Sequence, residues 1–171
     1  DHQLYNISTS IISSRKMFDV KDDTIKKGIQ KIALKGRLQE IKEGRLKDIA
    51  QDNRLVIDGG HNISAALSIA KWIGSQSVEV NIICGMLNDK DHVDFMKCFE
   101  GKIKSATLVD IPHQENSIDK KELKKKCANL NINFKTADSI EQSIKSYSKY
   151  KNSIILICGS LYLVGEILNL N

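Results

Sequence analysis

The sequence predicts an α/β fold in which a mostly parallel, Rossmann-like sheet carries helices on both faces. Apolar runs rich in β-branched residues recur along the chain, and segments with apolar residues at helical spacing separate them. Strands of a parallel sheet are continuous apolar runs because helices cover both faces. The length of 171 residues allows one well-buried domain and a small appendage.

The first fifth of the chain is expected to be a short helical segment. Residues 3–18 and 22–34 both have apolar residues at helical spacing. Asp22 or Asp23 can cap the second of these helices, because a carboxylate at that position accepts free backbone N–H groups.

A glycine-containing stretch, LKGRLQEIKEGRLKDI at residues 34–49, follows. Gly36 and Gly44 interrupt it, which is typical of turns. We expect a linker that leads into a β-hairpin, with strands at 38–41 and 46–49.

From residue 54 onward, apolar runs and amphipathic segments alternate. Strands are expected at 54–58, 78–86, 105–111, 132–134 and 153–159. Helices are expected at 62–74, 91–99, 119–130, 139–150 and 160–168. This alternation predicts parallel strands joined by helical crossovers.

Composition indicates a cytoplasmic globular protein. Hydrophobic residues make up 41% and charged residues 27%, and no apolar run approaches the roughly 20 residues of a membrane span. The N-terminus has no basic start followed by an apolar core, so it does not resemble a signal peptide. The four cysteines lack metal-binding spacing, and Cys84 and Cys158 fall in apolar runs, as expected for reduced core residues.

The net charge of +5 favours anionic partners, including nucleotides and polyglutamates. The densest basic stretch, DKKELKKKC at 119–127, is interpreted as a solvated helix face. Aromatic residues are 5% of the chain and do not alternate with the basic ones, so nucleic-acid binding is not expected.

Polar and glycine-containing segments follow the predicted strands. They are residues 58–62, 85–91, 111–113 and 159–160. In an open α/β sheet, ligands bind outside the carboxyl ends of the strands, where free N–H groups of the next helix favour an anion. The sequence therefore predicts a ligand site at this edge.

Two residues of the first segment have alternative interpretations. Asp58 can accept hydrogen bonds from a ribose, or it can cap the following helix. His61 can orient a substrate or a phosphate, or it can be a hydrogen-bonded loop residue. Neither suffices for a zinc site, and no metal ligands are predicted. The sequence contains neither GxGxxG nor GxxxxGK[ST], so the chain has no phosphate cradle of either common type.

Four motifs together resemble a known family. They are GRLQ at 36–39, DGGHN at 58–62, GMLNDKD at 85–91 and CGSLYLVGEIL at 158–168. In this order they resemble the C-terminal domain of folylpolyglutamate synthase/dihydrofolate synthase, within the Mur ligase superfamily. The resemblance implies that residues 1–34 are the tail of a central ATPase domain plus a linker, and that residues 35–171 are the C-terminal domain.

The resemblance implies an ATP-dependent ligase that adds L-glutamate to dihydropteroate or to a folate through an acyl phosphate. The expected cofactors are ATP and Mg²⁺, with metal ligands mainly in the central domain. That domain is also the expected partner, since it carries the P-loop, and this segment alone is expected to be inactive. The family resemblance further suggests a monomer.

Roles carry over to five positions by this resemblance. Arg37 matches an arginine that reaches the ATP phosphates, and Asp58 an aspartate that binds the nucleotide at its ribose. His61 matches a catalytic histidine near the nucleotide and the incoming glutamate, and Asn62 follows it at the nucleotide. Ser160 matches a serine that holds a glutamate carboxylate.

The sequence leaves some assignments open. GRL recurs at 44–46, so Arg45 is an alternative to Arg37, although GRLQ is the closer match. Gly60 and Ile63 stand where the family has alanine and proline, and no role is assigned to the DKD residues at 89–91. The sequence also allows a non-catalytic nucleotide- or folate-binding module, and we compare it with a receiver-like domain. The second lacks the acidic cluster and late lysine that it requires.

Overall fold

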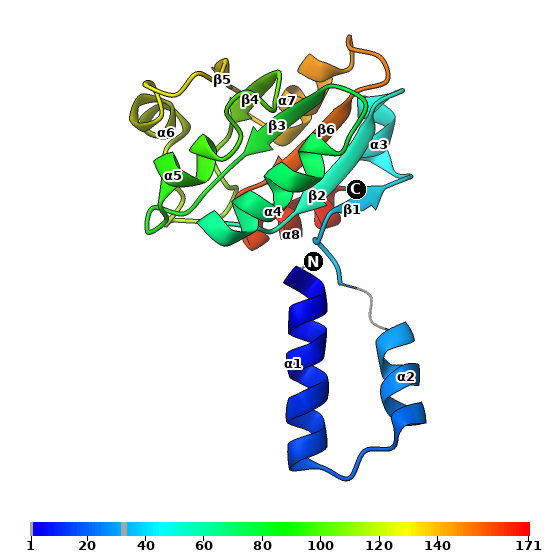
Figure 1. The fold of residues 1–171 in the computed structure, drawn as a ribbon. Helices are drawn as coiled ribbons and strands as arrows, with labels where there is room; N and C mark the ends of the chain where they lie inside the picture. Colours follow the sequence, from blue (N-terminus) through cyan, green and yellow to red (C-terminus); the bar gives the residue numbers. More distant parts are fainter. Residues whose placement is uncertain (1, 32–33) are drawn as a thin grey trace. The chain divides into compact units, whose positions relative to one another are not determined.

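The structure, a computed structural model, describes residues 2–31 and 34–171, with side chains from residue 5 onward (Figure 1). The chain divides into two compact units, Asp1–Lys35 and Gly36–Asn171. None of the helices in the described ranges is long and apolar enough to cross a membrane.

The first unit contains two helices, α1 (His2–Met17) and α2 (Asp22–Gln30), as the helical spacing predicted. Residues 32 and 33 of the predicted second helix lie outside the described residues. The expected cap is wrong, because Lys21 occupies the N-cap position. Asp22 and Asp23 instead lie in the first turn of α2, where negative charge favours the helix N-terminus.

The second unit contains a six-stranded sheet in the order β1-β2-β6-β3-β4-β5. The strands are β1 (Gln39–Ile41), β2 (Arg54–Asp58), β3 (Val80–Cys84), β4 (Ser105–Leu108), β5 (Phe134–Thr136) and β6 (Ile154–Cys158). All neighbours pair in parallel except β1, which runs antiparallel to β2. The predicted fold class is therefore confirmed.

Helices cover both faces of this sheet (Figure 1). They are α3 (Arg45–Ala50), α4 (Ile63–Gly74), α5 (His92–Lys97), α6 (Lys120–Lys126), α7 (Ile140–Tyr147) and α8 (Leu161–Leu170). Residues of α4, α5 and α6 form one apolar cluster with the sheet. Residues of α3, α7 and α8 form the other.

The predicted β-hairpin is wrong. Its first strand forms as β1, which pairs with β2, but residues 46–49 belong to α3. The apolar residues Leu46, Ile49 and Ala50 have the i, i+3, i+4 spacing of a helix face, and both Leu46 and Ala50 are fully buried. The helix forms because this spacing places both residues in the core at once.

The predicted strand at 132–134 is displaced toward the C-terminus. Phe134–Thr136 pairs with β4, and its last two residues, Lys135 and Thr136, are exposed at the edge of the sheet. A half-exposed edge strand lacks the continuous apolar run that marked the central strands, so its register was the least well specified.

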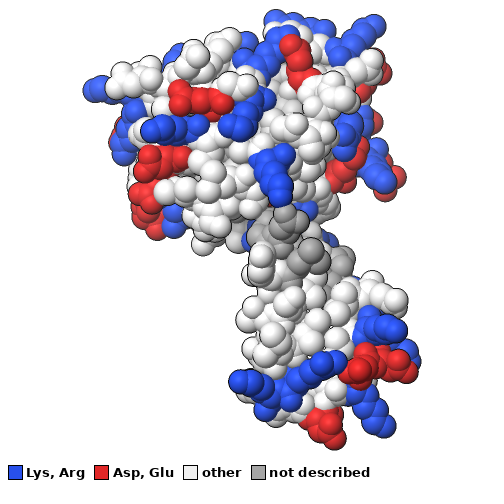
Figure 2. Space-filling model, viewed as in Figure 1, with Lys and Arg blue, Asp and Glu red and all other residues white. Residues whose placement is uncertain are grey.

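Charged residues are interspersed on the surface rather than gathered into one basic patch, at least on the face in Figure 2. The Lys-rich helix α6 buries Leu123 and exposes Lys121, Lys124 and Lys125 to solvent. Its interpretation as a solvated helix face is confirmed.

Candidate functional site

The carboxyl ends of β2, β6 and β3 meet at one edge of the sheet. Asp58, Cys158 and Cys84 are in register there as the last residues of these strands. The next residues are also bonded to one another: the Gly159 N–H donates to Gly60 O over 3.0 Å. Three of the four predicted segments, 58–62, 85–91 and 159–160, therefore lie side by side at this edge. We call them the rim.

The fourth segment, after β4, supports this rim. A Cβ atom on Gly85 would lie 3.1 Å from the Ile111 side chain, which is buried. His113 is exposed, with a φ of +57°, and is not among the residues that line the cavity. This segment therefore packs beneath the rim.

A cavity of about 190 Å³ opens at this edge. It is lined by His61, Leu87, Lys90, Gly159, Ser160, Leu161 and Tyr162. The predicted site residues His61 and Ser160 thus share one cavity, although 99 positions separate them in the chain.

Asp58 is 6% exposed, and backbone groups occupy both of its carboxylate oxygens. Oδ2 accepts the Leu38 N–H at 2.9 Å, and Oδ1 accepts the Gly60 N–H at 2.7 Å. The alternative that Asp58 caps α4 is wrong, because Asn62 is the N-cap of that helix. Through these two hydrogen bonds, Asp58 instead connects the 36–39 segment with the loop after β2.

Arg37 is exposed at the start of this segment, close to Gly59. Its Nη1 donates to Gly36 O at 3.2 Å. Arg45, the alternative arginine, is also exposed, but its guanidinium is already paired: its Nη2 lies 2.9 Å from Glu141 Oε1, and its Nε donates to Leu170 O. The geometry favours Arg37 as the arginine available to a ligand.

His61 is half-buried, and its Nδ1 lies 2.9 Å from Gly59 O. A carbonyl oxygen cannot donate, so Nδ1 must carry the proton of this hydrogen bond. In the neutral imidazole, Nε2 is therefore unprotonated and can accept a proton or a hydrogen bond.

The two remaining predicted residues cap helices. Asn62 Oδ1 accepts the Ala65 N–H at the start of α4. Ser160 is 3% exposed, and its Oγ accepts the Tyr162 N–H at the start of α8. A hydroxyl that accepts can still donate its own proton, so Ser160 and the N-terminus of α8 can together bind a carboxylate.

Lys90 lines the cavity, although the sequence assigned it no role. Its Nζ donates to Asp89 Oδ2 at 2.9 Å. This hydrogen bond is the main reason why the pKa of Asp89 is lowered, with a smaller contribution from the positive charge of Lys90. Asp91 is the N-cap residue of α5, but its side chain makes no capping hydrogen bond.

Two cavity residues, Leu161 and Tyr162, were also missed by sequence reasoning. These two residues are 49% and 54% exposed. The available signal was their position directly after Ser160, since the first residues of a helix at this edge lie at the ligand.

No cluster of three or more His, Cys, Asp or Glu side chains that could hold a metal ion occurs within residues 2–31 and 34–171. Cys84 and Cys158 lie in the apolar core rather than at the cavity. The residues of the described part therefore do not fit a metal centre.

The chain is similar to proteins of known family. Residues 45–170 match the family model described as dihydrofolate synthetase, C-terminal domain. The chain is 26% identical to a probable dihydrofolate synthetase of Schizosaccharomyces pombe, over 97% of this chain and 42% of the relative. It is also 26% identical to a dihydrofolate synthase/folylpolyglutamate synthase of Buchnera aphidicola, over 98% of this chain and 41% of that protein. The chain thus spans about two fifths of the length of these relatives.

Solved structures share the fold. Escherichia coli FolC in complex with DHPP and ADP superposes with a TM-score of 0.77, at 21% identity over 96% of this chain and 38% of that one. Mycobacterium tuberculosis folylpolyglutamate synthase complexed with ADP and AMPPCP gives 0.74, at 17% identity over 88% of this chain and 35% of that one. A Yersinia pestis relative that gives 0.70 is complexed with AMPPNP and a Mn ion.

Proposed function

Because this chain belongs to the dihydrofolate synthetase C-terminal domain family, we propose that it forms part of an ATP-dependent ligase that adds L-glutamate to dihydropteroate or to a folate. The names of the relatives support this reaction class. The observation that carries the proposal is the convergence of the family motifs on one sheet edge, around a cavity that contains His61 and Ser160.

We further propose that residues 1–34 are the tail of a central ATPase domain plus the linker, and that residues 35–171 are the C-terminal domain. The division of the chain between Lys35 and Gly36 supports this assignment. The partner of the chain is then the central domain, which supplies the P-loop and the Mg²⁺ ligands. We place the enzyme in the cytoplasm and expect a monomer, as the family resemblance suggests.

In this reaction the acceptor carboxylate takes the terminal phosphoryl group of ATP, which gives an acyl phosphate and ADP. Arg37 stabilises the negative charge on the transferred group, since it is an exposed cation next to the loop after β2. Asp58 and Asn62 lie on either side of His61 in the nucleotide-binding loop, and the amide nitrogen of Asn62 can donate while its oxygen caps α4.

The amine of glutamate then attacks the acyl carbon, phosphate leaves, and an amide forms. His61 Nε2 accepts the proton that the attacking amine loses, because Nδ1–H is held by Gly59 O. Ser160 and the first N–H groups of α8 hold a glutamate carboxylate beside it.

The test uses the complete gene product that contains this chain. Incorporation of radiolabelled glutamate is measured with dihydropteroate and with a folate as acceptors. Arg37→Ala is expected to lower turnover about 100-fold or more, the scale found when a group that stabilises transition-state charge is removed. Glu40→Gln is the matched control, because Glu40 is close in the chain but its carboxylate pairs with Arg54.

Two results would contradict the proposal. One is a complete gene product that incorporates no glutamate with either acceptor. The other is an Arg37→Ala variant whose turnover stays within about twofold of the unsubstituted enzyme. An antibody against this chain gives an independent measurement, the mass of the native polypeptide. A mass more than twice that of this chain would support the ligase. A native polypeptide of the same mass would favour the non-catalytic binding module, which the comparisons do not favour.

A further inference from the structure

His92 is a buried histidine directly after the loop that lines the cavity, and the proposed reaction does not use it. It begins α5, where it shares a buried face with Phe95 and Met96 at the i, i+3, i+4 spacing of a helix. Phe95 and Met96 belong to the apolar core, so packing of this face fixes the position of the ring. A buried polar ring needs a hydrogen-bond partner.

The partner is a backbone carbonyl in the loop after β3. His92 Nε2 lies 2.9 Å from Leu87 O. Because a carbonyl oxygen cannot donate, Nε2 must carry the proton of this hydrogen bond. The His92 backbone N–H also donates to Lys90 O at 3.0 Å. One residue is thus hydrogen-bonded to Leu87 and to Lys90, which are the two residues of this loop that line the cavity.

The loop has a second attachment, to the segment that follows β4. The Asn88 N–H donates to Asn116 O at 2.9 Å. Asp91, the N-cap residue of α5, makes no side-chain hydrogen bond to the helix. The side chain of His92 therefore supplies the hydrogen bond that a capping residue would otherwise give between the loop and the start of α5.

We propose that His92 is a positioning residue for the incoming glutamate and that it acts through Leu87 and Lys90. This inference rests on the proposed function, in which Ser160 holds a glutamate carboxylate in the same cavity. The His92 ring is not among the residues that line the cavity, so it acts only through the loop. Its hydrogen bond to Leu87 O keeps this wall of the cavity in place when glutamate enters.

A histidine that only fills the core would behave differently from one that holds the loop, and amide side chains separate the two cases. The amide nitrogen of glutamine lies about as far from Cβ as Nε2 of histidine does, and it donates. The amide nitrogen of asparagine lies closer to Cβ, near the place of Nδ1, and does not reach Leu87 O. His92→Gln therefore keeps the hydrogen bond, whereas His92→Asn loses it.

The experiment measures the kinetics of His92→Gln and His92→Asn in the complete gene product. We expect His92→Asn to raise the KM for glutamate by about 5- to 20-fold, because Leu87 O loses its donor and the cavity wall shifts. The KM for ATP should stay within about twofold, since the loop is assigned to the glutamate cavity. His92→Gln should restore the KM for glutamate to within about threefold of the unsubstituted enzyme.

Val93→Asn is the matched control. It places the same amide in the same helical turn, but on the exposed side, because Val93 is 39% exposed. Its KM for glutamate is expected to be that of the unsubstituted enzyme.

Two further readouts do not depend on ligase activity. Nitrogen-15 NMR of histidine-labelled protein at alkaline pH should show His92 protonated at Nε2 and His61 at Nδ1, since each proton faces a carbonyl oxygen. Hydrogen exchange of the Asn88 amide should be at least about fivefold faster in His92→Asn than in His92→Gln, because only the first loosens the loop.

The outcomes are distinguishable. An equal rise in the KM for glutamate in His92→Gln and His92→Asn would show a packing role and would overturn the inference, as would an unchanged KM in His92→Asn. If His92→Asn does not fold, the tautomer decides, and a His92 proton on Nδ1 would overturn the inference. A complete gene product that incorporates no glutamate would instead contradict the proposed function.

Discussion

Gly159 turns the chain from β6 into α8 with a φ of +107°, and its backbone lies against two neighbouring strand ends. A Cβ at this position would lie 2.7 Å from Gly85 O and 2.8 Å from Cys84 Sγ. We expect Gly159→Ala to lower the free energy of unfolding by roughly 1–3 kcal/mol, through the strained φ and the contact with backbone. Thermal unfolding measures this as a lower midpoint.

Gly74→Ala is the matched control for this prediction. Gly74 ends α4, and a Cβ there would meet nothing within 4 Å. Alanine should therefore be neutral or should stabilise by up to about 1 kcal/mol, since it restricts the unfolded chain more than glycine does. Equal midpoints for the two variants would show that the rim tolerates a side chain at Gly159.

The cysteines should differ in reactivity. Burial raises the pKa of the Cys127 thiol to about 11, and burial also raises the pKa of the half-buried Cys98. With an ordinary thiol pKa of 9.0, the shift at Cys127 lowers its thiolate fraction at pH 8 by about 100-fold. We expect iodoacetamide at pH 8 to label Cys98 first, as followed by mass spectrometry. Labelling of Cys127 at the same rate would contradict its burial.

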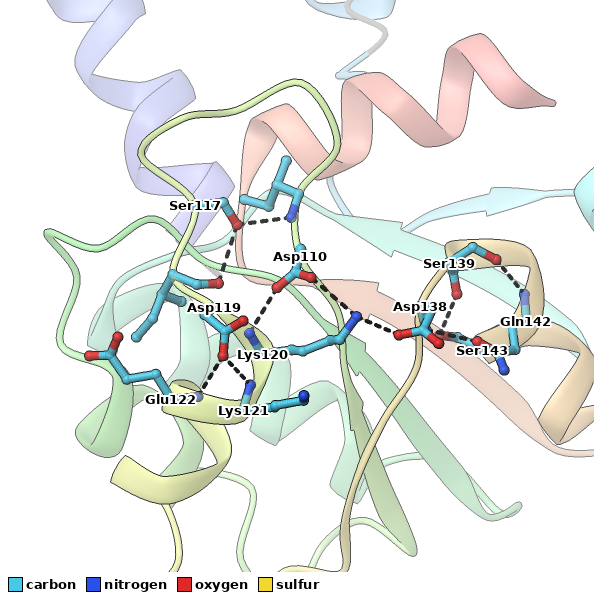
Figure 3. A network of polar contacts seen from close by, with 12 residues as sticks. Asp110, Ser117, Asp119, Lys120, Lys121, Glu122, Asp138, Ser139, Gln142 and Ser143 are labelled. Carbon is cyan, nitrogen blue, oxygen red and sulfur yellow. Dashed lines mark hydrogen bonds and ion pairs between the residues drawn. The ribbon is translucent and has the colours of Figure 1, made fainter.

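At the scale of elements, an ion-pair network joins the ends of β4 and β5 to the start of α6 (Figure 3). The side chain of Lys120 is 12% exposed and lies between two carboxylates, with Nζ 2.7 Å from Asp138 Oδ1 and 3.2 Å from Asp110 Oδ2. Lys120→Met keeps the aliphatic stem and removes both ion pairs. We expect it to lower the unfolding midpoint by a few degrees, and Lys121→Met, on the exposed face of α6, to change it less.

The effect of Lys120 should depend on pH in a defined direction. The hydrogen bond with Asp138 raises the pKa of Lys120 above 10.5 and is also the main cause that lowers the pKa of Asp138 below 3.8. The lowered pKa of Asp138 stabilises the folded state above pH 3.8. This stability is lost as the pH falls through the folded-state pKa. The raised pKa of Lys120 stabilises the folded state below pH 10.5. This stability is lost as the pH rises through the folded-state pKa of the lysine. The difference between wild type and Lys120→Met should thus be largest near neutral pH, and a constant difference across the range would contradict the network.

The elements that the sequence predicted well are those with a strong local pattern. The central strands β2, β3 and β6 are buried along nearly their whole length, so apolar residues dominate each of them. The strand predicted at 46–49 is wrong because so short an apolar segment fits both a strand and a helix, and tertiary contacts decide between them. One such contact is distant in the chain: Asn171 Oδ1 accepts the Leu46 N–H at the start of α3.

The candidate site was predictable in its location but not in its bonding. Chain order places the polar segments after the strands, and parallel strands bring those segments to one edge. The bond from the Leu38 N–H to Asp58 joins residues 20 positions apart and depends on the antiparallel pairing of β1, which no local pattern specified. The sequence therefore identified Asp58 as a site residue, but it predicted only a helix cap or a nucleotide ligand as its role.

For the whole molecule, the distribution of buried residues separates the two units. Both apolar clusters consist of residues between 41 and 167, so the described core lies entirely in the Gly36–Asn171 unit. Helix α2 has no buried residues, and α1 exposes Ile12 and Met17. Most of the hydrophobic stabilisation should thus belong to the second unit.

A chain that begins at Gly36 should accordingly fold by itself. The turn around Arg37 would be retained, because Gly36 is hydrogen-bonded to Gln39 and to Gly59 within the same unit.

We expect residues 36–171 to unfold in one cooperative transition, with a midpoint within a few degrees of that of residues 1–171, as followed by near-ultraviolet circular dichroism and calorimetry. The helices of the first unit should add far-ultraviolet signal that melts broadly, because isolated short helices are marginal in water. A loss of cooperativity, or a midpoint lower by more than about 10 °C, would mean that residues 1–35 stabilise the second unit, and the Arg37 turn would then have to be studied only in the longer chain.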